Sequence, residues 1–497
     1  MLAGGLGWWL LDRSGSGAPM SAAPPRTAAA TAPATTGTSR RNSVAVLPFV
    51  CLSANKADEY LSDGMTEELL NALGKVPGLR VPGRTSCFNF KGNTDEGLIR
   101  KVGDQLRVRT VLEGSVRKDG EKLRITAQLV NVDDGLLLWS DNYDRSMQDI
   151  LAVQVEVAQQ VVQALKVELG VEASRALAKT STTNPEAHRL YMLGRHYALK
   201  VTDEDNEKAI EYFHQALKLD PGYARAYAGL ADTWDLRLPP KEMVSIVRSH
   251  AEAALKLDPE LAEAHCSIAW ILLSSDWDFA GAERAFARAI QLQPNLAWAH
   301  DGYGWPFMFV GRFDEAEAAF KKAVDLDPRA AYTNTDLAML YRCTGQFDKA
   351  VEYSRQAIDL DSRHPWAYHN LGWSLLLQGK PSEAVSPFEQ LQKLGENPNF
   401  RMDPGCAYAA LGDRAKAEAV IKELEDMARH RYVPAWTQGY IWLYLNERDR
   451  ALDLLERSVA ERDPNCIWFN VDPALDSLRN EPRFQALLSQ IGFPNKR

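Results

Sequence analysis

The sequence predicts a small mixed-sheet α/β domain followed by an all-helical superhelix of repeated helical hairpins. Two observations lead to this fold class. The stretch VLEGSVRKDGEKLRITAQLV (residues 111–130) alternates apolar and polar residues on both sides of an Asp-Gly pair, which is the pattern of a β-hairpin. Further along, a motif of the form LKLDP ends at Pro221, Pro259, Pro294 and Pro328. Its intervals of 38, 35 and 34 residues are typical of repeated helix pairs.

Composition and charge restrict the classes of function. The 497 residues carry a formal net charge of −9, which argues against nucleic acid as the main partner, because a phosphate-binding face needs excess Lys and Arg. The six cysteines are scattered, without the paired spacing of a zinc site or a disulfide framework. We therefore expect buried or idle thiols, and no metal or other cofactor is indicated.

The chain starts with a short apolar segment, MLAGGLGWWLLD (residues 1–12), and continues with a linker rich in Ser, Gly, Ala, Pro and Thr (residues 13–42). The apolar segment is shorter than the about 20 residues that span a bilayer. It is interpreted as an anchor in the membrane interface or as the remnant of a longer transmembrane helix, and a frayed apolar terminus is the third alternative. The linker cannot bury a core, so a flexible chain is expected there.

The front domain is expected over residues 43–170. Its first strand lies in SVAVLPFV, a nearly continuous apolar run. The stretch SDGMTEELLNALGKV predicts a helix with Ser62 or Asp63 as its N-cap. LRVPGR then predicts a second strand, and EGLIRKVGDQLR predicts a second helix.

The hairpin follows. With Asp119-Gly120 as a two-residue turn, Val116 faces Leu123, and one face of both strands is apolar. A third strand in LLLWSDNYD and a long helix over about 147–169 complete the domain. The hairpin is then expected to form the edge of a small mixed sheet whose apolar side is covered by helices.

The helical repeats are expected over residues 187–465, with about eight units. GRFDEAEAAFKKAVDLDP places Gly311 in a turn, Phe320 between neighbouring hairpins, and the small Ala316 and Ala323 where helices meet. This pattern resembles the tetratricopeptide repeat. Each hairpin cannot bury its own apolar face, so stacking produces one superhelix. Residues 466–497 are expected to form a C-terminal cap.

The motifs SVAVLPFV, EYLSDGMTEELLNAL, RTSCFNFKG and LLLWSDNYDR together resemble the bacterial TolB amino-terminal-like domain, which is related to flagellar and curli envelope proteins. In that family the domain often precedes tetratricopeptide repeats. The resemblance implies a transmembrane helix upstream and, before it, a winged-helix or class III adenylate cyclase domain. This sequence departs from the pattern, because its upstream part contains only the linker and the apolar segment.

No sequence motif indicates catalysis. There is no phosphate-binding G-x-x-x-x-G-K-[ST] loop and no H-E-x-x-H. A candidate anion pocket consists of Asp63 and Gly64 at the predicted helix start, with Arg84 and Ser86 after the second predicted strand. Capping and a structural turn are the alternative roles of these four residues. We therefore expect a protein that is not an enzyme.

A second candidate site is the inner groove of the repeats, which the first helix of each hairpin lines. Aromatic rings with a few polar groups suit an extended peptide, since rigid rings provide contact area at low entropic cost. Packing between helices is the alternative role. The predicted groove residues are Trp298, Asp301, Trp305, Tyr332, Arg342, Trp366, His369, Trp373, Trp436 and Tyr440.

These observations favour a non-enzymatic scaffold or sensor of the bacterial envelope that binds a protein or peptide partner through the repeat groove. The alternative is the sensory or regulatory half of a class III adenylate cyclase or winged-helix transcription regulator that lacks its effector domain. The family resemblance favours association with a membrane and repeats in the periplasm, whereas the unpaired cysteines favour the cytoplasm.

Overall fold

The computed structural model describes residues 42–167, 169–179, 181–198, 203–233, 239–395 and 397–494. The predicted N-terminal segment and nearly all of the predicted linker lie outside these residues. Within the described part of the chain, no helix combines the length and the apolar character that crossing a membrane requires.

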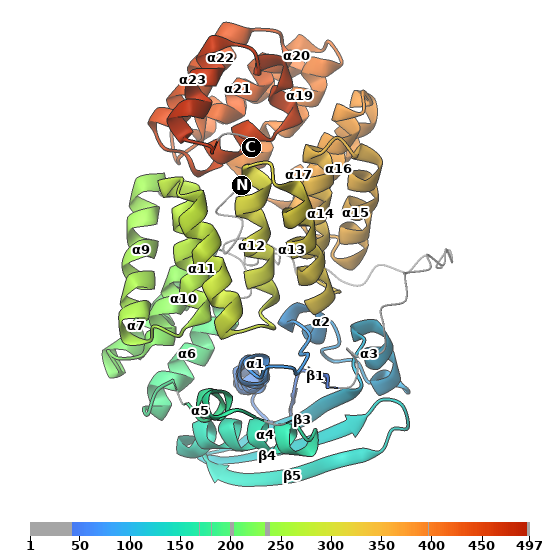
Figure 1. Cartoon of the computed structure of the whole chain (residues 1–497), viewed down its shortest axis with the longest axis vertical. Helices are drawn as coiled ribbons and strands as arrows, with labels where there is room; N and C mark the ends of the chain where they lie inside the picture. The colour runs from blue at the N-terminus through green and yellow to red at the C-terminus, as the bar shows by residue number, and fades with distance from the viewer. Residues whose placement is uncertain are drawn as a thin grey trace.

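A mixed sheet forms one end of the molecule (Figure 1). Its strand order is β1-β3-β4-β5, and β2 also pairs with β3. Strands β1 and β2 run parallel to β3, while β3, β4 and β5 are antiparallel. The hairpin β3–β4 therefore lies inside the sheet, and its prediction as the edge is wrong because β5 pairs with β4. The strands are β1 (Val44–Val46), β2 (Val50–Cys51), β3 (Thr110–Asp119), β4 (Lys122–Asn131) and β5 (Leu137–Ser146).

The predicted hairpin register is also wrong. Val116 lies opposite Ile125, not opposite Leu123. The two turn residues are Gly120 and Glu121, because Gly120 adopts the left-handed φ of 58° that the turn requires. This moves the pairing by two positions, so every side chain keeps its face, and the predicted apolar face is confirmed by the burial of Val116, Leu123 and Ile125.

The first helix, α1 (Glu59–Gly74), starts one turn earlier than predicted. A short 3-10 turn, Lys56–Asp58, leads into it. Ser62 and Asp63 therefore lie inside the helix, and neither is its N-cap. The predicted second strand in LRVPGR is also wrong, because this segment makes only an isolated bridge between Arg80 and Ser43.

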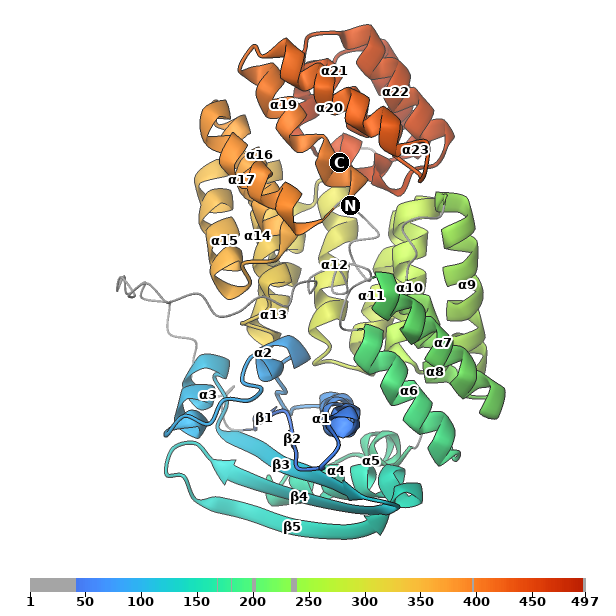
Figure 2. The ribbon, with the colours of Figure 1, turned by 180° about the vertical axis from the view of Figure 1, so that it is seen from behind.

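The remaining helices of the front domain lie on the same side of the sheet as α1 (Figures 1 and 2). Their apolar faces cover the buried face of the hairpin, and α1 lies between the sheet and the repeats. The opposite face of the sheet is polar, with exposed Arg117, Lys122 and Arg124. These helices are α2 (Arg84–Phe88), α3 (Leu98–Leu106), α4 (Ile150–Ala164) and α5 (Val171–Ala178).

Helical hairpins follow as a curved array, and the fold class is the one predicted: a small mixed sheet followed by a tetratricopeptide-like superhelix. Gly304 shows why small residues recur at the helix contacts, because a Cβ there would lie 2.5 Å from the Phe320 ring. The helices are α6 (Pro185–Ala198), α7 (Asp203–Leu219), α8 (Ala224–Asp232), α9 (Pro240–Leu257), α10 (Ala262–Ile271), α11 (Phe279–Leu292), α12 (Ala297–Phe309), α13 (Phe313–Leu326), α14 (Ala331–Cys343), α15 (Phe347–Leu360), α16 (Pro365–Leu377), α17 (Pro381–Leu394), α18 (Pro398–Arg401), α19 (Asp403–Ala410), α20 (Arg414–Met427), α21 (Ala435–Tyr444) and α22 (Arg448–Ala460).

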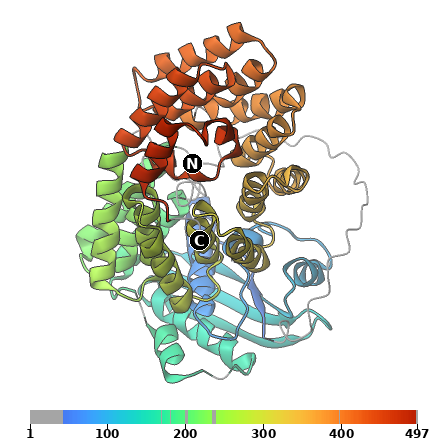
Figure 3. The same cartoon turned by 45° about the horizontal axis from the view of Figure 1, so that its top comes forward.

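The C-terminal segment, Pro464–Ile491, turns back toward the inside of the array (Figure 3). It consists of two 3-10 helices, Pro464–Asn470 and Pro473–Leu478, and α23 (Pro482–Ile491). The Trp468 ring lies 5.6 Å from that of Trp305 and 4.9 Å from that of Phe309. This segment, called the cap below, therefore fills part of the inner face of the repeats.

Candidate functional site

The front domain also lies against the repeats, through the chain between α1 and α2. Asn295, just before α12, holds this segment by its main chain. Its side-chain oxygen accepts a hydrogen bond from the Val81 amide at 3.3 Å, and its side-chain nitrogen donates to the carbonyls of Leu79 at 2.7 Å and Gly74 at 3.2 Å. The Asn295 side chain thus forms hydrogen bonds with main-chain groups of the front domain. Proteins commonly bind extended peptides through such main-chain hydrogen bonds.

Asp327, between α13 and α14, holds the start of α2. Its Oδ1 accepts a hydrogen bond from the Ser86 amide at 2.7 Å, and the Arg329 amide donates to the Ser86 hydroxyl at 2.8 Å. Burial raises the pKa of the Asp327 carboxyl to about 6, although the hydrogen bonds from Ser86 and Thr85 act against the shift. A Cβ at Gly83 would lie 2.4 Å from the Asp327 carboxylate, so only glycine fits there.

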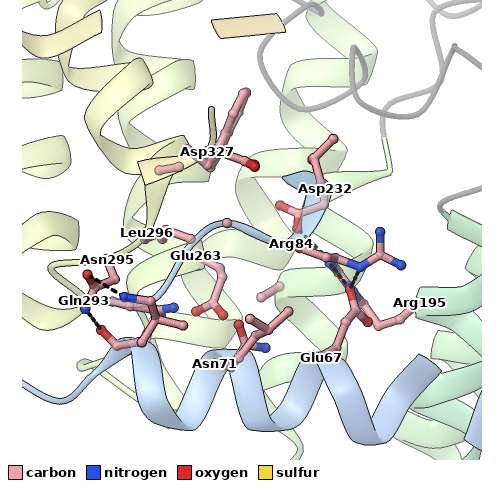
Figure 4. A pocket seen from close by; sticks show the side chains of 18 of the residues that line it. Glu67, Asn71, Arg84, Arg195, Asp232, Glu263, Gln293, Asn295, Leu296 and Asp327 are labelled. Carbon is pink, nitrogen blue, oxygen red and sulfur yellow. Dashed lines mark hydrogen bonds and ion pairs between the residues drawn. The ribbon is translucent and has the colours of Figure 1, made fainter. Parts of the chain in front are cut away.

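A row of acids on α1 meets arginines from both parts of the molecule (Figure 4). Glu67 Oε1 lies 2.8 Å from Arg84 Nε and 3.4 Å from Arg195 Nη2. Arg195 also lies 3.4 Å from Asp232 on α8. Burial raises the pKa of the Asp232 carboxyl to about 7, which the charge of Arg195 opposes. One residue further along α1, Glu68 pairs with Arg225.

These contacts enclose a pocket of about 190 Å³ at the junction of the two parts. One wall is α1 with the segment 81–85, and the other consists of α6, α8 and the residues around the starts of α10 and α12. In Figure 4, Asn71 of α1 and Glu263 of α10 point toward one another across this pocket. The pocket is a partly open hollow, and a concave site with apolar walls and a few convergent polar groups is the usual form of a small-molecule site.

The predicted anion pocket has a different surrounding. Asp63 Oδ1 lies 2.7 Å from Lys91 Nζ, and a Cβ at Gly64 would lie 2.5 Å from the Met192 sulfur, so α6 fills that place. Burial favours a higher pKa for the Asp63 carboxyl, but hydrogen bonds from His196 and Lys91 hold it below its usual value. Arg84 and Ser86 are paired as described above. The predicted anion pocket required a helix start at Asp63, but α1 begins four residues earlier, at Glu59. The anion-binding role of these residues stays a prediction.

The predicted groove residues lie on the inner face of the array, but that face is largely covered. Nine of the ten are buried, and only Trp298 is partly exposed. The expectation that they line an open groove is wrong for these nine, because the cap, the front domain and neighbouring helices pack on them. Whether any of them binds a partner stays a prediction. The buried nine are Asp301, Trp305, Tyr332, Arg342, Trp366, His369, Trp373, Trp436 and Tyr440.

The polar members of this set have partners inside the array. Arg342 lies 3.5 Å from Asp472 of the cap, and Tyr440 donates a hydrogen bond to the same carboxylate at 3.0 Å. His369 Nδ1 lies 2.7 Å from Asp403, and burial lowers the pKa of that imidazole while it raises the pKa of the carboxyl.

Sequence reasoning named four of the residues at this junction, Arg84, Ser86, Trp298 and Tyr332, but assigned them to two separate sites and missed the other residues of the pocket and of the docking contacts. Asn295 and Arg329 each follow the proline that ends a repeat motif, where the two preceding motifs have Gly222 and Glu260. That position marks the two repeats whose loops hold the segment before α2 and the start of α2. Among the described residues, no group of three or more His, Cys, Asp or Glu side chains is placed to hold a metal ion.

In comparisons with known proteins, the repeats and the front domain match the profiles of different families. The profile of the tetratricopeptide repeat matches residues 329–396, and a second profile of that repeat matches residues 190–223 and 307–329. The profile of the second domain of HilA/YgeH-like transcriptional regulators matches residues 39–162. The front domain is thus HilA-like by this match, and its resemblance to the TolB-like domain stays a prediction.

A curated relative named "Putative adenylate cyclase 3", from Rhizobium meliloti (strain 1021), is 39% identical over 189 residues. These residues are 38% of this chain and 32% of the relative, so the match spans about a third of that protein.

Solved structures also match. A thermophilic TPR protein of Thermus thermophilus is 21% identical, with 38% of this chain and 99% of that chain covered and a TM-score of 0.33. The Cut9–Hcn1 hetero-tetramer of the APC/C is 17% identical over 69% of this chain and 63% of that chain, with a TM-score of 0.41.

Proposed function

We propose that this chain is a non-catalytic scaffold and sensor of the bacterial envelope, which binds a protein partner through the inner face of its repeats. The observation that carries the proposal is the use of that face within the chain itself. Asn295 and Asp327 hold an extended segment of the front domain through main-chain hydrogen bonds, as a repeat array holds a peptide. A partner would reach the predicted groove residues by displacing the front domain or the cap.

An alternative function has support from the comparisons. The match to the HilA/YgeH-like regulator domain and the identity with part of a protein named as an adenylate cyclase favour a sensory or regulatory half of a signalling protein. In this proposal the front domain and the repeats receive the signal, and a separate effector domain acts on it. An in-frame effector domain encoded upstream of Met1 would favour this alternative over the scaffold.

Membrane association through the N-terminus and repeats in the periplasm are part of the same proposal, with the cytoplasm as the alternative location. The TolB-like resemblance, with its relation to envelope proteins, supports the periplasm. A topology reporter fused at the C-terminus of the full chain decides between the two locations.

Photo-crosslinking tests partner binding in the native host. A photoreactive amino acid replaces Trp298, the partly exposed groove residue, and a control replaces the exposed Ile246 on α9. We expect a protein that crosslinks from position 298 and not from position 246. Its binding should also speed hydrogen exchange of the Val81 amide, because the front domain is displaced. A partner that crosslinks equally from both positions contradicts groove binding, and formation of cyclic AMP from ATP by the purified chain contradicts a non-catalytic scaffold.

A further inference from the structure

The pocket between α1 and the repeats has an excess of hydrogen-bond acceptors. Gln293 is 3% exposed, and its side-chain oxygen has no hydrogen-bond partner among the described residues. The Oε2 atom of Glu263 is buried and also lacks a partner within the described chain. Both residues line the same hollow. One donor without a partner in the described chain, the buried Nε1 of Trp298, lines the same pocket. Buried polar atoms are normally paired, so the two acceptors that outnumber it indicate that a further donor is to be supplied from outside.

The charges around the pocket give the sign of that donor. Each of the three arginines that line it already has an acid: Arg84 and Arg195 share Glu67, Arg195 also meets Asp232, and Arg225 pairs with Glu68. Glu263 makes no ion pair among these described contacts. Glu263 is therefore a carboxylate of this pocket that no arginine reaches at ion-pair distance among the described residues, and a cation beside it would be favoured over an anion.

The other walls are apolar. Leu70 and Leu296 line the pocket from opposite sides, and the partly exposed Trp298 lies at its border with Tyr332, at a ring distance of 6.2 Å. A volume of about 190 Å³ is close to the liquid volume of six water molecules at about 30 Å³ each. The ligand is therefore small, with an apolar body.

We propose that this pocket binds a small organic ammonium ion, a primary amine on a short apolar chain. The protonated amine donates to Glu263 Oε2 and Gln293 Oε1, and the chain lies along Leu70, Leu296 and the Trp298 ring. The ligand touches both the front domain and the repeats, so it stabilises their docked arrangement by its affinity for that arrangement alone. This inference does not depend on the proposed function.

Calorimetric titration of the full chain tests the proposal with three probes of similar shape: pentylamine, 1-pentanol and pentanoate. We expect saturable binding of pentylamine only. Glu263→Gln keeps the size of the side chain and removes its charge, so it should weaken the binding of pentylamine about tenfold or more. Glu252→Gln is the matched control, because Glu252 is exposed on the neighbouring helix α9, and it should bind pentylamine as the unchanged chain does.

Leu296→Trp fills the pocket without changing any charge, so it should abolish binding while Glu263 is still present. Thermal melting of each variant without ligand shows whether it is folded, and loss of binding in either folded variant supports the site. Three outcomes overturn the proposal: pentanoate binds as tightly as pentylamine, Glu263→Gln binds pentylamine unchanged, or pentylamine does not bind the unchanged chain at millimolar concentration.

Discussion

The two segments that fill the inner face of the superhelix do so with different chemistry. The cap presents an aromatic side chain, Trp468, which packs edge to face on Trp305 and Phe309. The front domain presents main-chain amides, which meet the side chains of Asn295 and Asp327, and the carboxylates of Glu67 and Glu68, which meet Arg195 and Arg225. The ring contacts of the cap are joined by one polar cluster, in which Asp472 meets Arg342 and Tyr440, whereas the front-domain contact encloses a pocket.

This difference shows which contact is the easier one to open. Opening an apolar contact exposes apolar surface at about 25 cal/mol per Å². A hydrogen bond that opens to water is replaced by another one, so its net contribution is only about 0.5–1.5 kcal/mol. The cap is therefore expected to open less readily than the front domain, and the front domain is expected to be the part that a partner displaces first.

The largest effect is expected at the cap. Trp468→Ala should lower the free energy of unfolding by about 3–5 kcal/mol, because it leaves a void between Trp305 and Phe309. Urea unfolding followed by circular dichroism measures the loss. The matched control is Trp442→Ala on α21, a partly buried ring that Arg450 covers at 4.6 Å, where about 1 kcal/mol is expected. An equal loss of unfolding free energy in both variants would show that Trp468 is not tightly packed between Trp305 and Phe309.

An effect of intermediate size is expected from pH at the front-domain contact. Burial raises the pKa of Asp327 from 3.8 to about 6 in the folded chain, so the folded state holds this proton where the unfolded state has lost it. The free energy of unfolding contributed by Asp327 should therefore fall as pH rises from about 4 to 6, by on the order of 3 kcal/mol, and stay constant above that range.

Asp327→Asn removes this titration, and the difference in unfolding free energy between the variant and the unchanged chain should vary with pH only between about 4 and 6. Urea unfolding at a series of pH values measures the difference. A difference that is independent of pH for Asp327→Asn would contradict the burial of an acid at this contact.

The repeats could be predicted from the sequence because their rules are local. A glycine or alanine recurs where a neighbouring ring leaves no space, as Gly304 does against Phe320, and the 34-residue spacing places these residues without knowledge of the rest of the chain. The alternation in the hairpin likewise predicted its buried face. Its register depended on which residue takes a positive φ, and the pattern of alternation does not contain that information.

The start of α1 was missed although a signal was present. Leu61, Met65 and Leu69 are buried at a spacing of four residues, so the apolar stripe extends to the N-terminal side of the predicted cap at Ser62 or Asp63. Polar residues inside the helix were mistaken for its start, because Asp63 and Ser62 are typical N-cap residues.

The junction pocket could not be predicted, since it depends on contacts between distant residues. Ser86 and Asp327 are 241 positions apart. Ser86 lies in the front-domain motif RTSCFNFKG and Asp327 in the repeat motif that ends at Pro328, and neither motif shows that the two residues meet. The burial of the groove residues could not be predicted for the same reason: aromatic residues on the first helix of each repeat indicate the inner face, but they do not show that the cap and the front domain cover it. Only the three-dimensional packing shows which part of the chain lies on that face.

The smallest effect is expected at Asn295, and it tests the comparison most directly. Asn295→Ala removes the acceptor of the Val81 amide and the donor to Leu79 and Gly74, so the docked state should lose about 1–3 kcal/mol while the cap is unaffected. Hydrogen exchange followed by mass spectrometry should then show faster exchange over residues 79–88 and no change over residues 464–478. Asn397→Ala is the control, because the Asn397 side chain accepts a hydrogen bond from the nearby Asn399 amide in a later repeat, and it should leave residues 79–88 unchanged. If Asn295→Ala instead speeds exchange in both segments equally, the front domain and the cap open together, and the inner face has one kind of contact rather than two.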